Sequence, residues 1–187
     1  SLAIPRWKDP VWVSWAIALS YLLHNFEEYG YDLLGQTFHF PLSICQQFGF
    51  ATLEACPVPL SFFVAVNIPL FWFAFPFAAL MAKRNPAVGM AGSAFILVNA
   101  ITHTAALFTP AGYSSGALTA IILFIPLSIW SFVAFFGRTK LLPWPIFWAV
   151  WVGGIAGHLM LFAAVLLFLN GVISADIMIA MQLVNPF

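Results

Sequence analysis

Five stretches of the chain are apolar over a length that can cross a lipid bilayer, which needs about 20 helical residues. They cover residues 11–29, 58–81, 87–108, 114–136 and 144–169. Short segments rich in polar and turn-forming residues separate them, such as the Lys-Arg-Asn-Pro run at 83–86. The alternation typical of β-strands is weak, and a transmembrane barrel needs many more polar positions for its lumen. The pattern predicts an all-α, polytopic membrane helix bundle of about five transmembrane helices, forming a single domain over residues 1–187.

The first stretch has a second interpretation. Arg6 and Lys8, followed by an apolar run, also resemble the charged and apolar regions of a secretory signal peptide. No small-x-small cleavage site precedes the polar residues that begin at His24, and cleavage would remove them. We therefore favour a membrane span for residues 11–29.

Composition also indicates a membrane protein. Of the 187 residues, 63% are apolar and only 6% are charged, whereas soluble domains carry about 25% charged residues. Twelve charged side chains cannot cover the surface of a soluble domain of this size. The six basic and six acidic residues balance, which argues against nucleic acid as a partner and leaves the membrane lipid bilayer.

The basic residues indicate an orientation. If the N-terminus is cytoplasmic, the cytoplasmic segments are the N-terminal tail and the loops after the second and fourth spans. These segments contain every lysine and arginine of the chain: Arg6, Lys8, Lys83, Arg84, Arg138 and Lys140. Because cytoplasmic loops are enriched in basic residues, we expect a cytoplasmic N-terminus and an exoplasmic loop at 30–57.

The exoplasmic loop contains both cysteines, Cys45 and Cys56. On that side of the membrane they can form a disulfide, or they can remain two unpaired, small apolar residues. Beyond the last span, residues 173–184 are predicted to form a surface helix with Asp176 facing water.

A few ionisable residues interrupt the spans: His24, Glu27, Glu28, His103 and His158. Such residues cost about 2.5–3.5 kcal/mol at the centre of a span and are functional candidates for that reason. His24, Glu27 and Glu28 share one helix face, since positions i, i+3 and i+4 are neighbours. At a rise of about 1.5 Å per residue, the histidines lie roughly 20–24 Å from the inner ends of their spans. The matched depth predicts one shared site in the outer half of the membrane.

Other residues have positions that suit the same site. Asn99 lies one turn before His103 and is a candidate to orient its imidazole. Small residues before His158 allow close helix packing, which would carry that histidine into the bundle. The candidates to donate hydrogen bonds to a ligand, near the start of the fourth span, are Tyr113, Ser115 and Thr119.

These residues also resemble a known family. His24-Asn25-Phe26-Glu27-Glu28 is an H-x-x-E-E motif, and the chain resembles the HXXEE family of small bacterial integral membrane proteins. Blocks similar to others of the family follow in the same order, at Asn99 to His103, Tyr113 to Thr119, and Gly157-His158. Ser115 stands where the family's tyrosine block usually has proline. The resemblance implies a bacterial inner-membrane location and supports the site, but it implies no particular reaction.

The residue types favour a metal centre. Three histidines and one carboxylate can complete a tetrahedral or five-coordinate ion, and the expected ligands are His24, Glu27, His103 and His158. Glu28 is then the candidate catalytic base on a metal-bound water. Zinc suits hydrolysis and non-haem iron suits oxidation. Such a centre within a membrane predicts a metal-dependent enzyme, a hydrolase or an oxidoreductase, acting on a lipid-like, hydrophobic small-molecule substrate.

Two other function classes stay open. Neighbouring carboxylates and a histidine can divide acid and base roles without a metal, as in a sterol or polyprenyl isomerase or cyclase. A non-enzymatic carrier or accessory membrane subunit could use the same polar cluster to hold its helices together. Glu27 and Glu28 share the face of His24 but point about 100° apart, so they are not equivalent toward one bound ion. Glu27, at i+3 from His24, is favoured as the ligand, and Glu28, at i+4, could coordinate instead.

Overall fold

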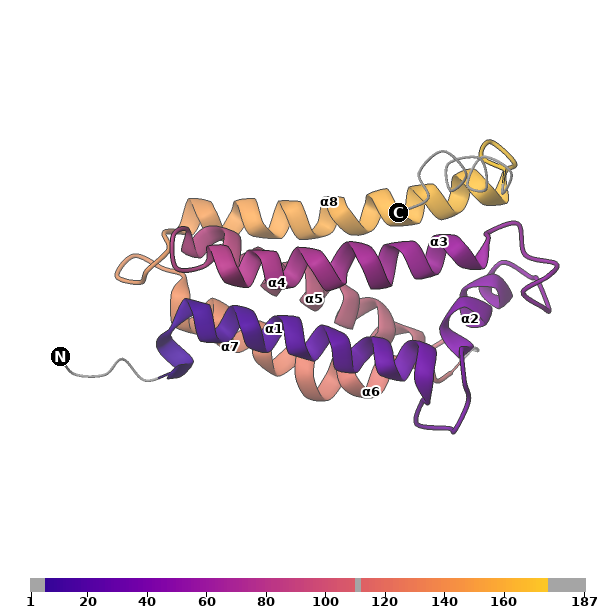
Figure 1. Ribbon diagram of the computed structural model, residues 1–187, viewed down its shortest axis with the longest axis horizontal. Helices are drawn as coiled ribbons and strands as arrows, with labels where there is room; N and C mark the ends of the chain where they lie inside the picture. The colour runs from indigo at the N-terminus through magenta and orange to yellow at the C-terminus, as the bar shows by residue number, and fades with distance from the viewer. Residues whose placement is uncertain (1–5, 110–111, 175–187) are drawn as a thin grey trace.

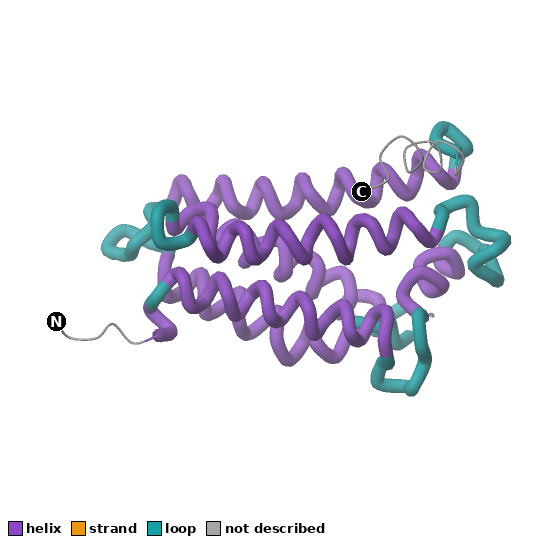
Figure 2. The backbone as a smooth tube through the Cα atoms, in the orientation of Figure 1, coloured by secondary structure: helices purple, strands orange, loops and turns teal. Residues whose placement is uncertain are grey.

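The computed structural model describes residues 6–109 and 112–174, and within them the chain is built from helices and connecting loops (Figure 2). Short helical segments join end to end into longer ones. The helices are a 3-10 turn at Arg6–Lys8, α1 at Pro10–Asn25, α2 at His39–Gln47, α3 at Leu60–Ala65, α4 at Phe71–Met81, α5 at Pro86–Ala106, α6 at Ala117–Thr119, α7 at Ile125–Phe135 and α8 at Trp144–Leu169. The surface helix predicted for residues 173–184 lies, from residue 175 on, outside the described residues.

Three π-helical turns connect these segments into continuous rods. The turn Phe26–Gly30 extends α1, Val66–Leu70 joins α3 to α4, and Ala120–Phe124 joins α6 to α7. A π turn widens the helix to an i to i+5 hydrogen-bonding pattern, and such turns often occur at functional sites. Each of the three lies next to a polar residue of the site described below, so they shape its walls.

Five rods run side by side along the long axis of the molecule (Figure 1). Four are long and apolar enough to cross a membrane: Leu60–Met81, Pro86–Ala106, Ala117–Phe135 and Trp144–Leu169. The rod at residues 10–30 is not among these four, because His24, Asn25 and the two glutamates lower its hydropathy. The structure therefore confirms a polytopic helical bundle and shows that its first rod is the most polar.

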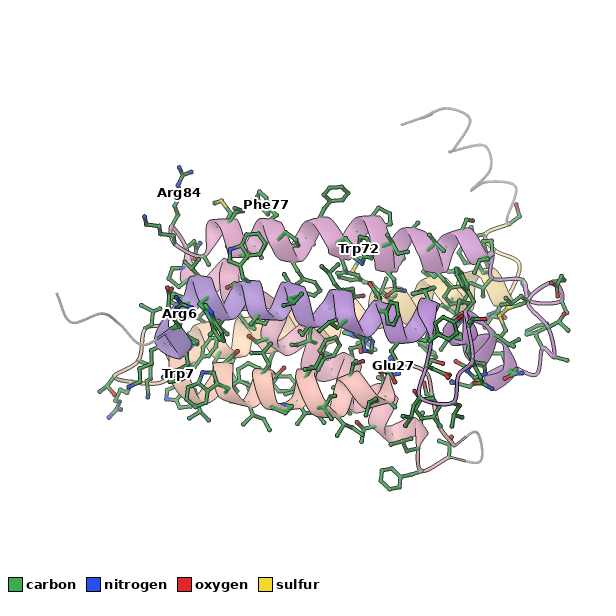
Figure 3. All side chains as sticks on the ribbon, turned by 60° about the horizontal axis from the view of Figure 1, so that its bottom comes forward. Arg6, Trp7, Glu27, Trp72, Phe77 and Arg84 are labelled. Atoms are coloured by element: carbon green, nitrogen blue, oxygen red, sulfur yellow. A yellow bond between two sulfur atoms is a disulfide. The ribbon has the colours of Figure 1, made fainter. Side chains whose placement is uncertain are left out.

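The helix starts at one end of the bundle follow local capping rules. The Asp9 side chain accepts a hydrogen bond from Val11 N, and Pro10 occupies the first helical position of α1. Asn85 and Pro86 do the same for α5. Both combinations are favoured because a cap side chain satisfies a free amide, while proline has no amide to satisfy. The basic segments lie at this end, as Arg6 and Arg84 illustrate in Figure 3.

Helix α5 lies at the centre of the bundle, and small residues let its neighbours approach. A Cβ atom on Gly154 of α8 would lie 3.0 Å from the backbone of Ala94 and Phe95. A Cβ on Gly92 would lie 2.9 Å from the Phe75 ring. The close approach of α8 carries His158 against the bundle, as the sequence predicts.

Helix α2 lies at the end of the bundle opposite the basic segments, near the end of α1 and the start of α3 (Figure 1). The sequence placed this segment in a loop, whereas residues His39–Gln47 form a helix. Cys45 and Cys56 form a disulfide, so of the two alternatives left open the bonded one is observed. Both cysteines are buried and pack with Tyr29, Phe63 and Phe168. The disulfide and this apolar cluster hold α2 in place.

Candidate intramembrane His/Glu site

Two imidazoles and one carboxylate meet inside the bundle. The Nε2 atoms of His24 on α1 and His103 on α5 each lie 3.3 Å from the same oxygen, Glu28 Oε1. The three ligand atoms all lie within 4.8 Å of one another, and all three residues are buried. We call His24, Glu28 and His103 the core triad.

The π turn at the end of α1 determines which glutamate joins the core triad. The wider turn begins at Phe26 and brings Glu28 over His24, four residues earlier. The second carboxylate oxygen of Glu28 accepts a hydrogen bond from Asn25 Nδ2 at 2.9 Å. Trp72 Nε1 donates to Asn25 Oδ1 at 2.8 Å, which fixes the orientation of the amide because an indole nitrogen can only donate. Only Oε1 of Glu28 is therefore left to face the histidines.

Glu27 points to a neighbouring helix instead. Its carboxylate accepts hydrogen bonds from the backbone amides of Leu118 and Thr119, at 3.0 and 2.8 Å, and from the hydroxyls of Tyr113 and Thr119. Four donors occupy the four lone-pair positions that an ionised carboxylate offers. Figure 3 shows Glu27 between α1 and the rod that begins with α6. The sequence favoured Glu27 as the ligand and Glu28 as the base, but it is Glu28 that the structure brings between the imidazoles.

The hydroxyl of Thr119 connects the two glutamates through His24. Thr119 Oγ1 has one proton, and its nearest acceptor is the Glu27 carboxylate. His24 Nδ1, 2.9 Å from the same hydroxyl, then donates its proton to the threonine oxygen. A neutral His24 consequently presents the lone pair of Nε2 to the core triad.

This arrangement leaves two hydrogen-bond acceptors facing one another. His24 Nε2 and Glu28 Oε1 are both buried, and neither has a hydrogen-bond partner among the described residues. Two buried acceptors in contact repel each other unless a positively charged species lies between them. The three residues of the core triad could therefore hold a cation, either a proton or a metal ion.

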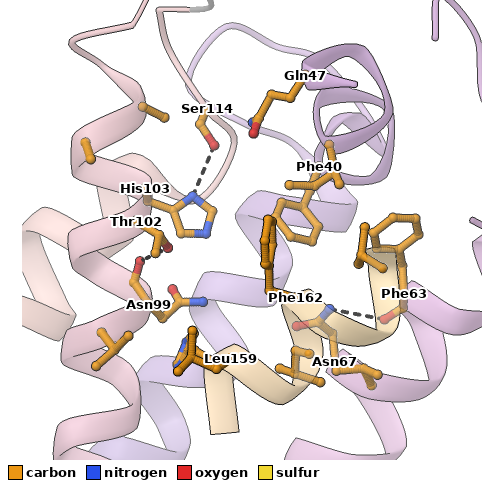
Figure 4. A pocket seen from close by; sticks show the side chains of 18 of the residues that line it. Phe40, Gln47, Phe63, Asn67, Asn99, Thr102, His103, Ser114, Leu159 and Phe162 are labelled. Carbon is orange, nitrogen blue, oxygen red and sulfur yellow. Dashed lines mark hydrogen bonds between the residues drawn. The ribbon is translucent and has the colours of Figure 1, made fainter. Parts of the chain in front are cut away.

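The loop before α6 closes the site from the other side. His103 Nδ1 lies 3.1 Å from Ser114 Oγ, as the dashed line in Figure 4 shows. Gly116 has a positive φ of 95°, and a Cβ there would lie 2.6 Å from His24 Cε1 and 2.8 Å from His103 Cε1. Both imidazoles thus pack directly on a residue without a side chain.

An apolar cavity of about 810 Å³ begins at His103. Its walls come from α3, α5 and α8, with α2 at the outer end (Figure 4). The aromatic residues of the wall include Phe40, Phe63, Phe71, Phe95 and Phe162. Cavities of this size and character bind small, mostly hydrophobic molecules.

His158 and Asn99 line this cavity rather than joining the core triad. His158 Nδ1 bonds to Gly154 O at 2.9 Å, and its ring lies over Phe95 with 4.1 Å between centroids. Asn99 has no hydrogen bond to His103, since the His103 Nδ1 atom contacts Ser114 instead. The structure thus places both residues at the cavity. Asn99 lies one turn of α5 before His103.

The remaining predicted residues, Tyr113, Ser115 and Thr119, bond to protein groups around the loop before α6 and are not among the residues that line the cavity. Tyr113 and Thr119 bond to Glu27, while Ser115 donates to Asp32 Oδ2 at 2.8 Å and lies 3.1 Å from His39 Nδ1. Burial, together with the Glu27 carboxylate, raises the pKa of the Tyr113 phenol above its ordinary value. Tyr113 therefore remains a donor to Glu27 at neutral pH.

Four residues that build the site have no role assigned to them in the sequence analysis: Asn25, Trp72, Ser114 and Gly116. Of these, Asn25 and Gly116 stand within the blocks that resemble the family. Asn25 lies inside the motif itself and Ser114 directly precedes Ser115, so position alone was a usable signal for both. Trp72 and Gly116 act through contacts between distant segments, which no local pattern reveals.

The comparisons with known proteins agree with the motif. No curated protein and no solved structure matches the chain. The family described as "protein of unknown function with HXXEE motif" matches residues 15–131, which include the whole core triad and Glu27. This match covers more than half of the 187 residues, and the chain belongs to the HXXEE family.

Proposed function

We propose that this protein is a metal-dependent membrane enzyme, with His24, Glu28 and His103 as the metal ligands and a lipid-like substrate in the adjoining cavity. The observation that carries the proposal is the buried contact between two acceptors, His24 Nε2 and Glu28 Oε1, which lie 3.3 Å apart and have no hydrogen-bond partner within residues 6–109 and 112–174. A divalent cation satisfies both acceptors at once.

The spacing of the ligand atoms supports a metal ion over a shared proton. Metal–ligand bonds of about 2.0–2.1 Å in tetrahedral geometry place neighbouring ligand atoms about 3.3–3.4 Å apart. Both imidazole-to-carboxylate distances of the core triad are 3.3 Å. A charge-assisted hydrogen bond would be shorter, about 2.7–2.9 Å.

The surroundings of the core triad match those of metal-binding histidines. Such histidines bind the ion through one nitrogen and bond through the other to an oxygen, which fixes the ring and its tautomer. Thr119 and Ser114 supply these oxygens for His24 and His103. Asn25 similarly fixes the Glu28 carboxylate.

Two histidines and one carboxylate leave coordination positions open for water or substrate. This ligand set occurs with catalytic zinc and with non-haem iron, which supply activated water and oxygen chemistry respectively. His103 lies at the boundary between the core triad and the cavity, so a molecule bound in the cavity would lie beside an ion held by the core triad. The apolar walls favour a hydrophobic, lipid-like substrate over a polar one.

Metal content tests this function directly. Protein purified in detergent is expected to contain about one equivalent of zinc or iron by elemental analysis. Glu28→Gln and His103→Gln should each reduce it at least fivefold, since each removes a ligand. Glu54→Gln is the matched control, because Glu54 is exposed in the loop outside the bundle.

Thermal unfolding separates metal loss from misfolding. Adding zinc or iron(II) to metal-stripped protein should raise the Tm of the parent and of Glu54→Gln, because a ligand that binds only the folded state stabilises it. The two triad variants should unfold cooperatively without that rise. A metal-free parent whose Tm does not respond to either ion would contradict the proposal and support acid–base chemistry by the same residues. Equal metal in all variants would also contradict it.

A further inference from the structure

The cavity contains a second polar position, separate from the core triad. His158 and Asn99 both line it, and their Nε2 and Oδ1 atoms are buried and have no hydrogen-bond partner in the part of the chain that the structure describes. Polar atoms buried in this way cost free energy unless a bound molecule satisfies them. Most of the 25 residues of the cavity wall are apolar, and these two buried atoms mark a place where a polar group of a ligand can bind.

His158 and Asn99 lie at the same level of the bundle. Helices α5 and α8 run in the same direction, and they touch where Gly154 meets Ala94 and Phe95. His158 is four residues beyond Gly154, and Asn99 is four residues beyond Phe95. Because both residues lie four positions beyond the same contact between α5 and α8, their side chains lie at the same level and face each other across the cavity.

The hydrogen bonds of His158 decide what it can recognise. Its Nδ1 faces the Gly154 carbonyl, which can only accept, so Nδ1 carries the proton. The Nε2 atom of the neutral ring is therefore an acceptor and needs a donor from the ligand. The amide of Asn99 can either donate or accept, since its two ends exchange by rotation.

We infer that the cavity binds a lipid alcohol, whose hydroxyl donates to His158 Nε2 and accepts from the Asn99 amide. A hydroxyl is the simplest group that satisfies both partners. A carboxylate would place a further acceptor against Nε2, and a pure hydrocarbon would leave both polar atoms unsatisfied. The inference names the substrate class of the proposed enzyme and in that respect rests on the proposed function.

The position of the hydroxyl also locates the reacting part of the molecule. Asn99 precedes His103 by four residues, which is about 6 Å along α5. Carbon atoms a few bonds from the hydroxyl therefore lie beside His103 and the core triad. The remaining hydrocarbon lies along the aromatic and aliphatic walls.

Exposed residues of the cavity wall lie on both α5 and α8, and we expect the cavity to open sideways, between these two helices. Residues of its wall that remain exposed include Thr102 and Ala105 on α5, and Ile155 and Leu159 on α8. The two helices touch at Gly154 and leave the cavity between them further out. In a membrane this opening faces the acyl chains, so an alcohol can enter from the bilayer itself.

Ligand selectivity tests the inference on metal-stripped protein. Purified protein would be equilibrated with tritiated hexadecan-1-ol, and hexadecane and palmitate would be tested as competitors. We expect the alcohol to bind at least tenfold more tightly than either competitor. His158→Phe and Asn99→Leu should each reduce the affinity for the alcohol about tenfold and leave the affinity for hexadecane unchanged. Phenylalanine keeps the ring over Phe95 while removing the acceptor.

Asn170→Leu is the matched control, since Asn170 is exposed at the end of α8 and does not line the cavity. It should bind the alcohol as the parent does, and all variants should be monodisperse with a cooperative thermal transition. Equal affinity for alcohol, alkane and carboxylate, or unchanged binding in both cavity variants, would overturn the inference. Metal content is measured on the protein as purified and alcohol binding on the metal-stripped protein, so the two results are independent. Selective alcohol binding by a protein that is purified without metal contradicts the proposed function alone. A protein that is purified with metal but does not select the alcohol contradicts this inference alone.

Discussion

At the scale of single residues, the core triad depends on a position with no side chain. Gly116 adopts a positive φ and contacts the Cε1 atoms of both His24 and His103. Any Cβ there would overlap both imidazoles, which are held from behind by Thr119 and Ser114. The rings would have to move apart, and the three ligand atoms would no longer face one point.

Gly116→Ala should therefore reduce bound metal at least fivefold, as measured by elemental analysis. Gly35→Ala is the control, because Gly35 also has a positive φ but has open space around its Cα. Both variants acquire backbone strain of about 1–2 kcal/mol, and only the first also displaces ligands. Metal loss of the same size in both would show that backbone strain, not the imidazole contact, is responsible.

The same scale shows why the sequence could place the site without assigning every role. Helical periodicity is local, so it could bring His24, Glu27 and Glu28 to one face. It could not choose between the glutamates, because the choice depends on the π turn at Phe26–Gly30 and on donors from the loop at Tyr113. Those donors come from residues about 90 positions further along the chain.

At the scale of elements, Glu27 serves as the cap of the rod that begins with α6. The first backbone amides of a helix have no partner within the helix, and a carboxylate satisfies them and complements the helix dipole. Leu118 N and Thr119 N are such amides, and both bond to Glu27. A residue at the end of the first rod thereby fixes the start of the fourth.

Glu27→Gln should lower the free energy of unfolding by roughly 1–3 kcal/mol, because a neutral amide offers fewer acceptor positions to the four buried donors. Thermal or denaturant unfolding in detergent measures the change. Glu54→Gln, with the same substitution at an exposed position, should be neutral. Bound metal should remain in Glu27→Gln; if it fell as far as in Glu28→Gln, a ligand role for Glu27 would be indicated.

Helix α2 shows where prediction from the sequence stops. The predicted span at 144–169 coincides with α8, and that at 87–108 differs from α5 by no more than two residues at either end. Long apolar runs specify such rods by themselves. Helix His39–Gln47 has nine residues and depends on the disulfide and on packing against Tyr29 and Phe63. Its stability comes from distant residues, which a pattern along the chain does not contain.

At the scale of the whole molecule, all basic segments gather at one end. The turn Arg6–Lys8 and the loops at 82–85 and 136–143 lie at the end of the bundle where α1 begins (Figure 1). The core triad and the cavity lie toward the opposite end, where α2 lies. This polarity supports the predicted orientation with basic loops in the cytoplasm.

Cysteine labelling of intact cells tests the orientation. Thr139→Cys, in the exposed loop between α7 and α8, should resist a membrane-impermeant maleimide added from outside and react after the membrane is opened. Gln36→Cys, in the exposed loop at the other end, should react without that step. The native cysteines do not interfere, since both are in the disulfide. The reverse labelling pattern would invert the proposed orientation.

With a sideways opening between α5 and α8, ligand binding depends on the concentration of the ligand in the lipid phase. A molecule that arrives from the bilayer is present at a mole fraction of the lipid phase, and its amount per volume of water has little bearing on occupancy. Doubling the detergent or lipid at a fixed amount of ligand should then halve the apparent affinity, because it halves the mole fraction of the ligand in the lipid phase. Binding and turnover by this protein are best expressed per mole of amphiphile, and comparisons between preparations hold only at equal mole fraction.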